Sequence, residues 1–258
     1  TTDHEGEVLK CAEDVAKEWH RFLKGKFSAT DREKSRPPME ALPCTQGQEP
    51  LSQKCFLRGL AKMARDKACG PDAIPADLYK HSEVCRGMLQ QLLQKIWLTE
   101  AVPAEFAKAT FVMIYKNKGS SDDPSKYRCI GLLSHAYKVF HQCLLERIEA
   151  ETGSYLSDWQ AGFRKQRGCR DNVMILRSVY DNMLDAGRAL YVTFVDYSAA
   201  FDSVGRKFLD RALQRAGASN KTRAIFRSIY SVANARTAVQ GVDAKTVQKC
   251  VDGCVEVD

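Results

Sequence analysis

The segment 191–202 constrains the fold most, because an apolar run ends there in a carboxylate. Residues 191–195 (YVTFV) are all β-branched or aromatic, and this composition predicts a strand. Asp196 follows the run at once. A lone carboxylate at the end of a buried strand costs free energy unless a partner such as a divalent cation compensates it. Asp196 is therefore either a metal ligand or the cap of the next turn or helix, and spacing alone does not separate these interpretations.

The net charge of +7 is concentrated in one part of the 258-residue chain. Residues 1–50 carry 8 basic and 10 acidic side chains, whereas residues 161–240 carry 14 basic and 6 acidic ones. A basic excess of this kind suits a polyanionic partner, most simply a nucleic acid. A merely solvated basic surface would give the same counts.

The cysteine and hydropathy patterns indicate an intracellular protein, with no distinction between nucleus and cytoplasm. The ten cysteines are scattered through expected helices and strands, unlike the disulfide framework of a short secreted chain. Cys250 and Cys254 form one C-x-x-x-C pair without a nearby His, which is a weak zinc pattern. The printed residues contain no signal-peptide pattern, and no apolar run among them reaches the ~18–20 residues of a membrane span. Because the chain starts at Thr1 and stops in a strand-like pattern, we expect a fragment of a longer polypeptide.

Apolar residues recur at helical spacing through much of the remaining chain. The expected helices are 5–27, 53–67 with Ser52 as N-cap, a pair within 76–98, 135–151, 172–186 between Asp171 as cap and Gly187 as terminator, 204–217 and 220–234. Residues 28–50 are rich in Ser, Pro, Gln and charge, which predicts a linker or an extended strap.

Short apolar runs predict two hairpins besides the strand 189–195. The first joins residues 110–115 to 127–133 through a loop, and the second joins 236–242 to 245–251. The first loop and its flanks carry several cations, namely Lys116, Lys118, Lys126 and Arg128. Cations on a loop suit the grip of a phosphate, although Lys is also common at a polar hairpin tip.

The segment 158–170 combines a glycine-bearing turn, aromatic side chains and four cations. Its residues include Gln160, Gly162, Phe163, Arg164, Lys165, Arg167 and Arg170. Glycine allows close backbone approach, an aromatic ring stacks on a base and the cations pair with phosphates. Binding to a single strand or a hybrid duplex uses this combination.

Five blocks, in this order, make the chain resemble the reverse transcriptase domain of non-LTR (LINE-type) retrotransposons, and more distantly group II intron enzymes. They are 67–75 (KACGPDAIP), 127–133 (YRCIGLL), 137–138 (YK), 160–164 (QAGFR) and 194–202 (FVDYSAAFD). The resemblance covers roughly residues 51–258. Each block alone is a weak signal, and the shared order makes a chance resemblance improbable.

The resemblance implies an α+β fold, the fingers and partial palm of a right-hand polymerase, rich in helices with short antiparallel strands. On this basis we expect an N-terminal helix and extended linker in residues 1–50. Residues 51–188 would form the fingers and the start of the palm, and residues 189–258 a partial palm. The implied partners are an RNA template, a DNA primer and a deoxynucleoside triphosphate, without a membrane. The oligomeric state is not indicated.

The implied reaction is attack of a primer 3′-hydroxyl on the α-phosphorus of the triphosphate. Two Mg²⁺ ions in the complete enzyme stabilise the attacking and leaving oxygens. The resemblance makes Asp196 the first metal-binding aspartate and the catalytic residue, with the carbonyl of Tyr197 as a further oxygen ligand. Asp202 is expected to cap the following helix instead.

The resemblance also assigns nucleotide and template contacts. Phe201 occupies the position where an aromatic ring would clash with a ribose 2′-hydroxyl. Arg128, with Lys116 or Lys118, matches the basic residues that clamp the triphosphate. The template or primer would contact Gln160, Gly162, Phe163, Arg164, Arg167 and Arg170.

The chain departs from the family pattern in two ways. Cys129 and Gly131 replace the usual Pro and Ser, and both are small enough to be tolerated. The family's signature Gln-Gly turn and the aromatic–X–Asp–Asp hairpin after it are not identified in this chain. Gln-Gly occurs only as a bare dipeptide, at 46–47 and 240–241, and the one Asp-Asp pair is Asp122-Asp123 in the first hairpin loop. We therefore expect this chain alone to bind Mg²⁺ poorly and not to polymerise, because too few anionic ligands repay the ion's dehydration. The alternative is a non-catalytic nucleic-acid-binding or scaffolding module that keeps part of the fold.

Overall fold

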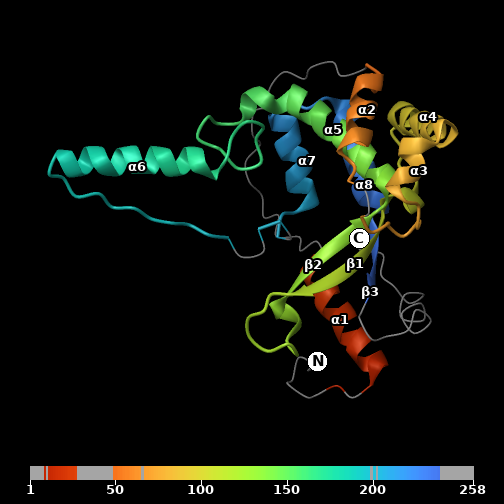
Figure 1. Ribbon diagram of the computed structural model, residues 1–258, viewed down its shortest axis with the longest axis horizontal. Coiled ribbons are helices and arrows are strands. Elements are labelled where there is room, and N and C mark those ends of the chain that lie inside the picture. Colours follow the sequence, from red (N-terminus) through yellow and green to blue (C-terminus); the bar gives the residue numbers. More distant parts are fainter. Residues whose placement is uncertain are drawn as a thin grey trace.

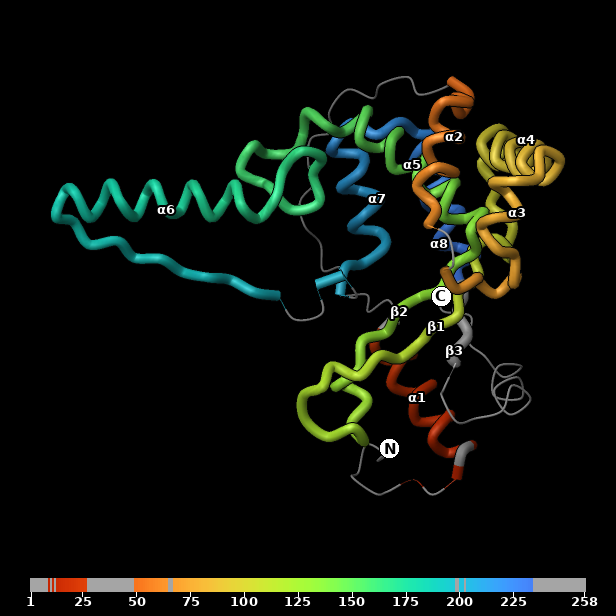
Figure 2. Tube along the Cα trace, viewed as in Figure 1, coloured from red at the N-terminus to blue at the C-terminus, as the bar shows by residue number. Residues whose placement is uncertain are grey.

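The computed structural model of the chain describes residues 9, 11–27, 49–64, 67–197, 200–201 and 203–238. A body of packed helices lies beside a small sheet, and a long arm projects from the body (Figures 1 and 2). The fold is helix-rich with short strands, which agrees with the expected α+β class. No helix in these ranges is long and apolar enough to cross a membrane.

The sheet contains three described strands in the order β2-β1-β3. β1 (Lys108–Tyr115) and β2 (Tyr127–Leu133) pair antiparallel and confirm the first predicted hairpin. β3 (Asn234–Ala238) pairs with β1 in parallel, so the expectation of antiparallel strands is only partly correct. A long helical connection lies between β1 and β3, and such a crossover allows two strands to run in the same direction. Residues 239–251 of the second predicted hairpin lie outside the described residues.

The helices of the body share one apolar core. They are α2 (Gln53–Lys62), α3 (Ala76–His81), α4 (Glu83–Thr99), α5 (His135–Thr152) and α8 (Asn220–Val232). Trp97, Phe140 and Ile225 are fully buried and come from α4, α5 and α8. Because α8 packs into the same core as α2–α5, the expected domain boundary at residue 189 divides residues that share one core.

Short 3₁₀ turns and one buried ionic network connect these helices. The turns are η1 (Ala104–Ala107), η2 (Pro124–Lys126) and η3 (Gly153–Tyr155). Near the end of α5, the Glu151 carboxylate accepts hydrogen bonds from the Ser219 N–H at 2.9 Å and from the Thr222 hydroxyl at 3.2 Å. It also pairs with Arg147 at 2.9 Å. An anion at the start of α8 satisfies otherwise unpaired N–H groups there and so fixes α8 against α5.

The caps confirm some of the predicted helix boundaries and correct others. The helix predicted at 53–67 ends at Lys62, where the Met63 N–H donates to the Leu60 carbonyl. Ser52 accepts a hydrogen bond from the Cys55 N–H at 3.2 Å, as expected for an N-cap. Gly187 has φ of 61° and ends α6 (Cys169–Asp185). Asp171 caps α6 as predicted, but from the third helical position and not as the N-cap residue, because α6 begins at Cys169. Asp171 lies in its first turn and accepts from the Gly168 N–H at 2.7 Å.

The N-terminal helix α1 (Ala12–Phe27) packs against the sheet and does not stand apart from it (Figure 1). Trp19 and Leu23 are buried, and the Trp19 ring meets the Tyr127 ring edge-on with centroids 5.1 Å apart. The amphipathic pattern therefore predicted the buried face of this helix and its end correctly, but the helix begins at Ala12, and the described residues 9 and 11 of the predicted range 5–27 are not helical. The expected linker falls at residues 28–48, outside the described residues.

The arm consists of α6 and the extended segment 189–197, which runs back toward the body (Figures 1 and 2). No residue of α6 is buried, and its predicted apolar stripe is exposed. The prediction of a strand at 189–195 is wrong, since this segment forms no ladder with the described strands. Strand propensity needs a partner strand within reach, and this segment runs along the arm, apart from the three-stranded sheet (Figure 1). After the arm, α7 (Arg206–Arg215) packs against α8.

Candidate nucleic-acid and nucleotide site

The loop before α6 is held by charges of its own. Arg164 donates through Nη1 to the Ser157 carbonyl at 2.7 Å. The Asp158 carboxylate lies 3.9 Å from the Arg164 guanidinium and 3.5 Å from that of Arg167. Two of the predicted phosphate-binding arginines are therefore already engaged in shaping the loop. Arg170 is exposed and has no ion-pair partner among the described residues.

Phe163 stands in a strained and exposed position at the tip of this loop. Its φ of 58° lies in the left-handed region, which costs a non-glycine residue about 1–3 kcal/mol. The side chain is 93% exposed, so core burial does not offset this cost. Gly162 beside it has open space where a side chain would stand. The loop thus presents a ring and accessible backbone to solvent, as a stacking surface for a base requires.

The structure brings Phe163 and Phe201 together, although 37 residues separate them in the sequence. Their ring centroids are 5.7 Å apart and their planes meet at 87°, an edge-to-face arrangement. The contact forms because α6 runs outward and segment 189–197 returns toward the body (Figure 1). Phe201 is 79% exposed, so both rings remain available to a ligand. A predicted template residue and a predicted nucleotide residue are thereby neighbours.

Asp196 and Tyr197 lie on the returning segment, and both are exposed. No side chain in the described ranges pairs with Asp196. Nor do three His, Cys, Asp or Glu side chains gather anywhere in those ranges in a way that could hold a metal ion. The described residues therefore do not form the Mg²⁺ site that the resemblance implies. In the turn that follows Asp196, residues 198–199 and Asp202 lie outside the described residues. The predicted capping role of Asp202 therefore stays a prediction.

The predicted cations of the first hairpin differ in whether they already have a hydrogen-bond partner. Lys116 donates through Nζ to the Ser125 carbonyl at 2.8 Å and so helps to close the loop. Lys118 is exposed without a partner among the described residues, and so is Arg128, which lies opposite Ile114 in the ladder. Lys118 and Arg128 are thus the two predicted triphosphate contacts that remain free. Figure 1 shows the loop between β1 and β2 and the arm as separate parts of the molecule.

The loop of this hairpin is rigidified by its own side chains. Asp123 accepts from both the backbone N–H of Ser125, at 2.8 Å, and its hydroxyl, at 2.7 Å. These hydrogen bonds, with Lys126 at 3.5 Å, lower the pKa of the Asp123 carboxyl. Hydrogen bonds to an ionised carboxylate favour the ionised form and so lower the pKa. Asp123 of the Asp-Asp pair thus caps the loop.

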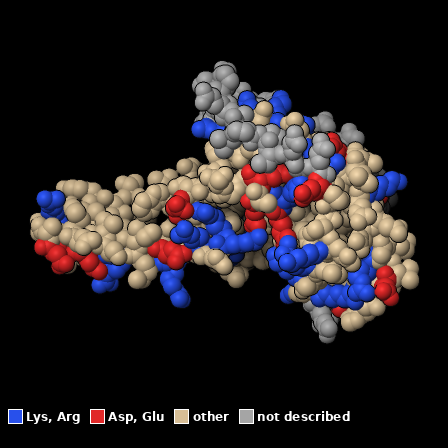
Figure 3. Space-filling view, turned by 90° about the horizontal axis from the view of Figure 1, so that it is seen from above, with Lys and Arg blue, Asp and Glu red and all other residues tan. Residues whose placement is uncertain are grey.

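Charged side chains gather where the arm joins the body (Figure 3). Lys and Arg dominate there, with acidic groups beside them, whereas much of the arm's surface is uncharged. A groove between α2 and α5 is a further basic feature, lined by Lys62, Lys67 and Lys138. The sequence reasoning assigned it no function. Lys67 belongs to the 67–75 block and Lys138 to the Tyr137-Lys138 block, and these two blocks were the signals that pointed to the groove.

Comparison with protein families supplies the decisive observation. Residues 114–253, more than half of the chain, match the family described as "Reverse transcriptase (RNA-dependent DNA polymerase)". The chain belongs to this family. The matched residues include β2, which is the second strand of the first hairpin. They also include the loop that carries Phe163, the whole arm and Phe201.

Two relatives come from insect retrotransposable elements. Both are named "Retrovirus-related Pol polyprotein from type-1 retrotransposable element R2". The protein from Nasonia vitripennis is 26% identical over 178 residues, which is 69% of this chain and 17% of the relative. The protein from Popillia japonica is 25% identical over 169 residues, or 66% of this chain and 22% of the relative. These similarities confirm the resemblance to non-LTR retrotransposon reverse transcriptases, and the chain spans about a fifth of each relative.

Proposed function

We propose that this chain forms the fingers and part of the palm of a polymerase that copies RNA into DNA by two-metal nucleotidyl transfer. Residues 51–188 would be the fingers and the start of the palm, and residues 189–258 a partial palm. The family membership supports the activity class. The Phe163–Phe201 contact carries the proposal, because it places the loop predicted to bind the template beside the residue predicted to contact the nucleotide.

The proposed role of each residue follows from its exposure and its charge. Phe163 and Gly162 would support the template base, with Gln160 beside them. Arg170 would pair with a backbone phosphate. Phe201 would place its ring against the sugar of the incoming nucleotide and so disfavour a 2′-hydroxyl.

The hairpin would approach the triphosphate through its free cations. Arg128 presents a guanidinium that can pair with two phosphate oxygens at once, whereas Lys118 acts as a point charge. Lys116 would contribute less, since it already binds a loop carbonyl. A movement of the hairpin toward the arm is needed, because the two lie apart in the structure (Figure 1).

Asp196 would be one ligand of the metal ions in the complete enzyme, together with the Tyr197 carbonyl. The described residues add no further carboxylate to it, so we derive no chemical step for this chain alone. What the chain itself supplies is binding and orientation of the nucleic acid and the nucleotide.

Binding to an RNA–DNA hybrid tests the proposal. We expect the logarithm of the affinity to fall linearly with the logarithm of the salt concentration. Arg170→Ala should reduce the slope by about 1 and leave stability unchanged, because Arg170 is exposed and has no ion-pair partner among the described residues. Arg164→Ala and Arg167→Ala should weaken binding and also loosen the loop. Lys95→Ala on α4 is the matched control, and an affinity that does not depend on salt would refute the proposal.

A further inference from the structure

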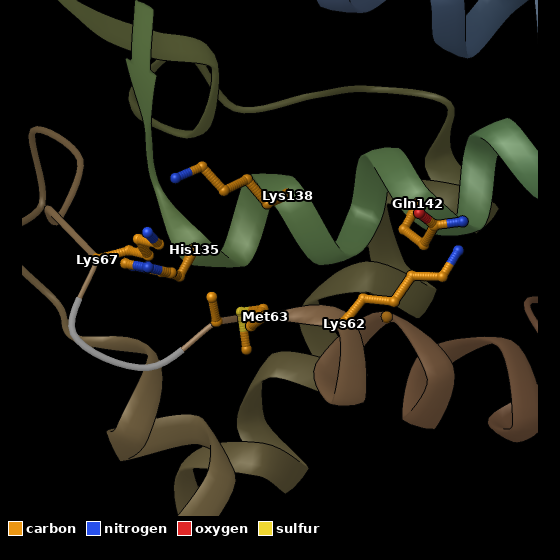
Figure 4. Close-up of a pocket in the computed structure, with 8 residues that line it drawn as sticks. Lys62, Met63, Lys67, His135, Lys138 and Gln142 are labelled. Atoms are coloured by element: carbon orange, nitrogen blue, oxygen red, sulfur yellow. The ribbon is translucent and has the colours of Figure 1, made fainter. Parts of the chain in front are cut away.

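A groove between the end of α2 and the first half of α5 lies outside the site described above (Figure 4). Its volume is about 230 Å³. Its lining residues are Gly59, Lys62, Met63, Ala64, Lys67, His135, Lys138 and Gln142. Three of these described side chains are cations and none of them is an anion, so the described lining is positively charged.

The three lysines are unpaired in the described part of the chain. Neighbouring basic residues of the same helices do have partners, since Arg58 pairs with Glu146 and Arg147 with Glu151. No acidic side chain of the described residues lies within ion-pair distance of Lys62, Lys67 or Lys138. Three positive charges around one groove repel one another, and a bound anion would relieve that repulsion.

The walls and floor of the groove are rigid. His135 is 2% exposed, and its Nδ1 donates to the Ile74 carbonyl at 3.1 Å. Gly59 packs so closely on α5 that a Cβ there would stand 3.1 Å from Val139. Lys80 also donates to the Met63 carbonyl and fixes the end of α2. A ligand would therefore enter a preformed groove, and little binding free energy would be lost in ordering the groove.

The cations are spread along the groove and do not converge on one point. Lys67, His135 and Lys138 lie at one end, and Lys62 and Gln142 at the other (Figure 4). Lys138 and Gln142 are four residues apart on α5, so they are neighbours along one face with Cβ atoms about 5–6 Å apart. This spacing suits an extended polyanion better than one small ion. No Phe, Tyr or Trp side chain is among the described lining residues, and the His135 ring is only 2% exposed, so the groove offers charge and an amide but little stacking surface for bases.

We propose that this groove binds backbone phosphates of a single RNA strand and is a second anchoring site for RNA, distinct from the Phe163 loop. The inference rests on the proposed function, which supplies RNA as the polyanion. Ammonium groups act as point charges toward phosphate oxygens, so the groove would hold RNA without regard to sequence.

Charge-neutralising substitutions test the groove. Lys62→Gln with Lys138→Gln removes one cation from each wall. Lys54→Gln with Lys95→Gln makes the same charge change at exposed, unpaired lysines of α2 and α4. Affinity for a labelled single-stranded RNA is measured by fluorescence anisotropy over a range of salt concentrations, after thermal unfolding has shown that both variants keep the wild-type Tm. We expect the groove variant to bind about tenfold more weakly and its log–log salt slope to shrink by about 1.4, while the control keeps nearly the wild-type values.

The outcomes separate the possible ligands. If the groove variant and the control bind RNA equally well, the groove proposal is refuted while the proposed function stands. If the wild type fails to bind RNA even at low salt, the proposed RNA binding fails as well. Tripolyphosphate and a polyglutamate peptide serve as competitors at equal charge concentration. The assignment to RNA is overturned if either competitor displaces RNA from the wild type as effectively as unlabelled RNA does, and if this displacement is lost in the groove variant. The groove would then be a general anion site.

Discussion

Gly70 is the residue at which close packing leaves least room. A Cβ at this position would stand 2.4 Å from the Ser134 nitrogen and 2.6 Å from the Leu133 carbonyl carbon. Both are backbone atoms at the junction of β2 and α5, so they cannot rotate away. We expect Gly70→Ala to lower the free energy of unfolding by about 2–3 kcal/mol, measured by urea denaturation.

Gly87 on α4 provides the matched control for that substitution. An added Cβ there meets nothing within 4 Å. Gly87→Ala should stabilise the chain by about 0.5–1 kcal/mol, because alanine loses less backbone entropy in a helix. Equal effects of the two substitutions would show that the contact between the Gly70 turn and α5 is not tight.

Tyr137 links stability to alkaline pH. Burial against the core raises the pKa of its hydroxyl to about 12, from an ordinary value of about 10. The Phe106 ring packs on it with centroids 5.7 Å apart. Below pH 10 the hydroxyl is protonated in both states, and between pH 10 and 12 only the unfolded state loses the proton. Stability from this residue is therefore complete below pH 10 and falls by about 2–3 kcal/mol as the pH rises to 12.

The variant Tyr137→Phe isolates this contribution from the other tyrosines and the lysines. We expect the free energy of unfolding, measured in urea at pH 9 and pH 11.5, to fall less with pH in the variant than in the wild type. Parallel pH profiles for the two proteins would contradict the burial of this hydroxyl.

At the scale of elements, the arm decides which residues meet. α6 and segment 189–197 form the outward and return paths that bring Phe201 to Phe163. In a full-length protein, we expect Phe201→Val to raise the incorporation of ribonucleotides relative to deoxynucleotides, because the smaller side chain leaves space for a 2′-hydroxyl. The measurement is primer extension with each nucleotide class.

Phe163→Val is the control for that prediction. It removes the other ring of the pair and the stacking surface for the template, so it should weaken template binding and leave the choice of sugar unchanged. If both variants alter sugar selectivity alike, the effect comes from loss of the ring contact and not from a steric gate at Phe201.

Local signals predicted the helices and the first hairpin well. Each such signal lies within a few neighbouring residues, as do the N-cap at Ser52 and the apolar runs of β1 and β2. The structure shows this cap and these two strands where the sequence predicted them. The strand predicted at 189–195 failed because pairing is not local. Its side chains favour a strand, but the sequence does not state which partner strand is available.

The site shows the same division between local and distant information. The family resemblance named Phe163 and Phe201 separately, and their contact depends on the length and direction of α6. The engagement of Arg164 and Arg167 by Asp158 was not predicted, because a positive residue in a basic segment gives no sign of its ion-pair partner. The α2–α5 groove was missed because its lysines come from segments far apart in the sequence.

At the scale of the whole molecule, the candidate chemistry lies outside the packed core. The body buries Trp97, Phe140 and Ile225 from three helices, whereas no residue of α6 is buried. Segment 189–197 is extended, exposed and outside the described sheet. The core can therefore be stable while the position of Asp196 is set by little more than the backbone of the arm.

This arrangement leads to the expectation that the chain alone does not extend a primer. Catalysis requires the reacting groups to be held within a fraction of an ångström, and an exposed carboxylate without a described partner is not held in this way. The assay combines the purified chain with an RNA template, a labelled DNA primer, deoxynucleotides and Mg²⁺, using a preparation shown to bind the hybrid. A full-length element protein serves as the positive control. Template-dependent extension that disappears in the Asp196→Asn variant would contradict the expectation, because it would show that this chain completes a metal site around Asp196 by itself.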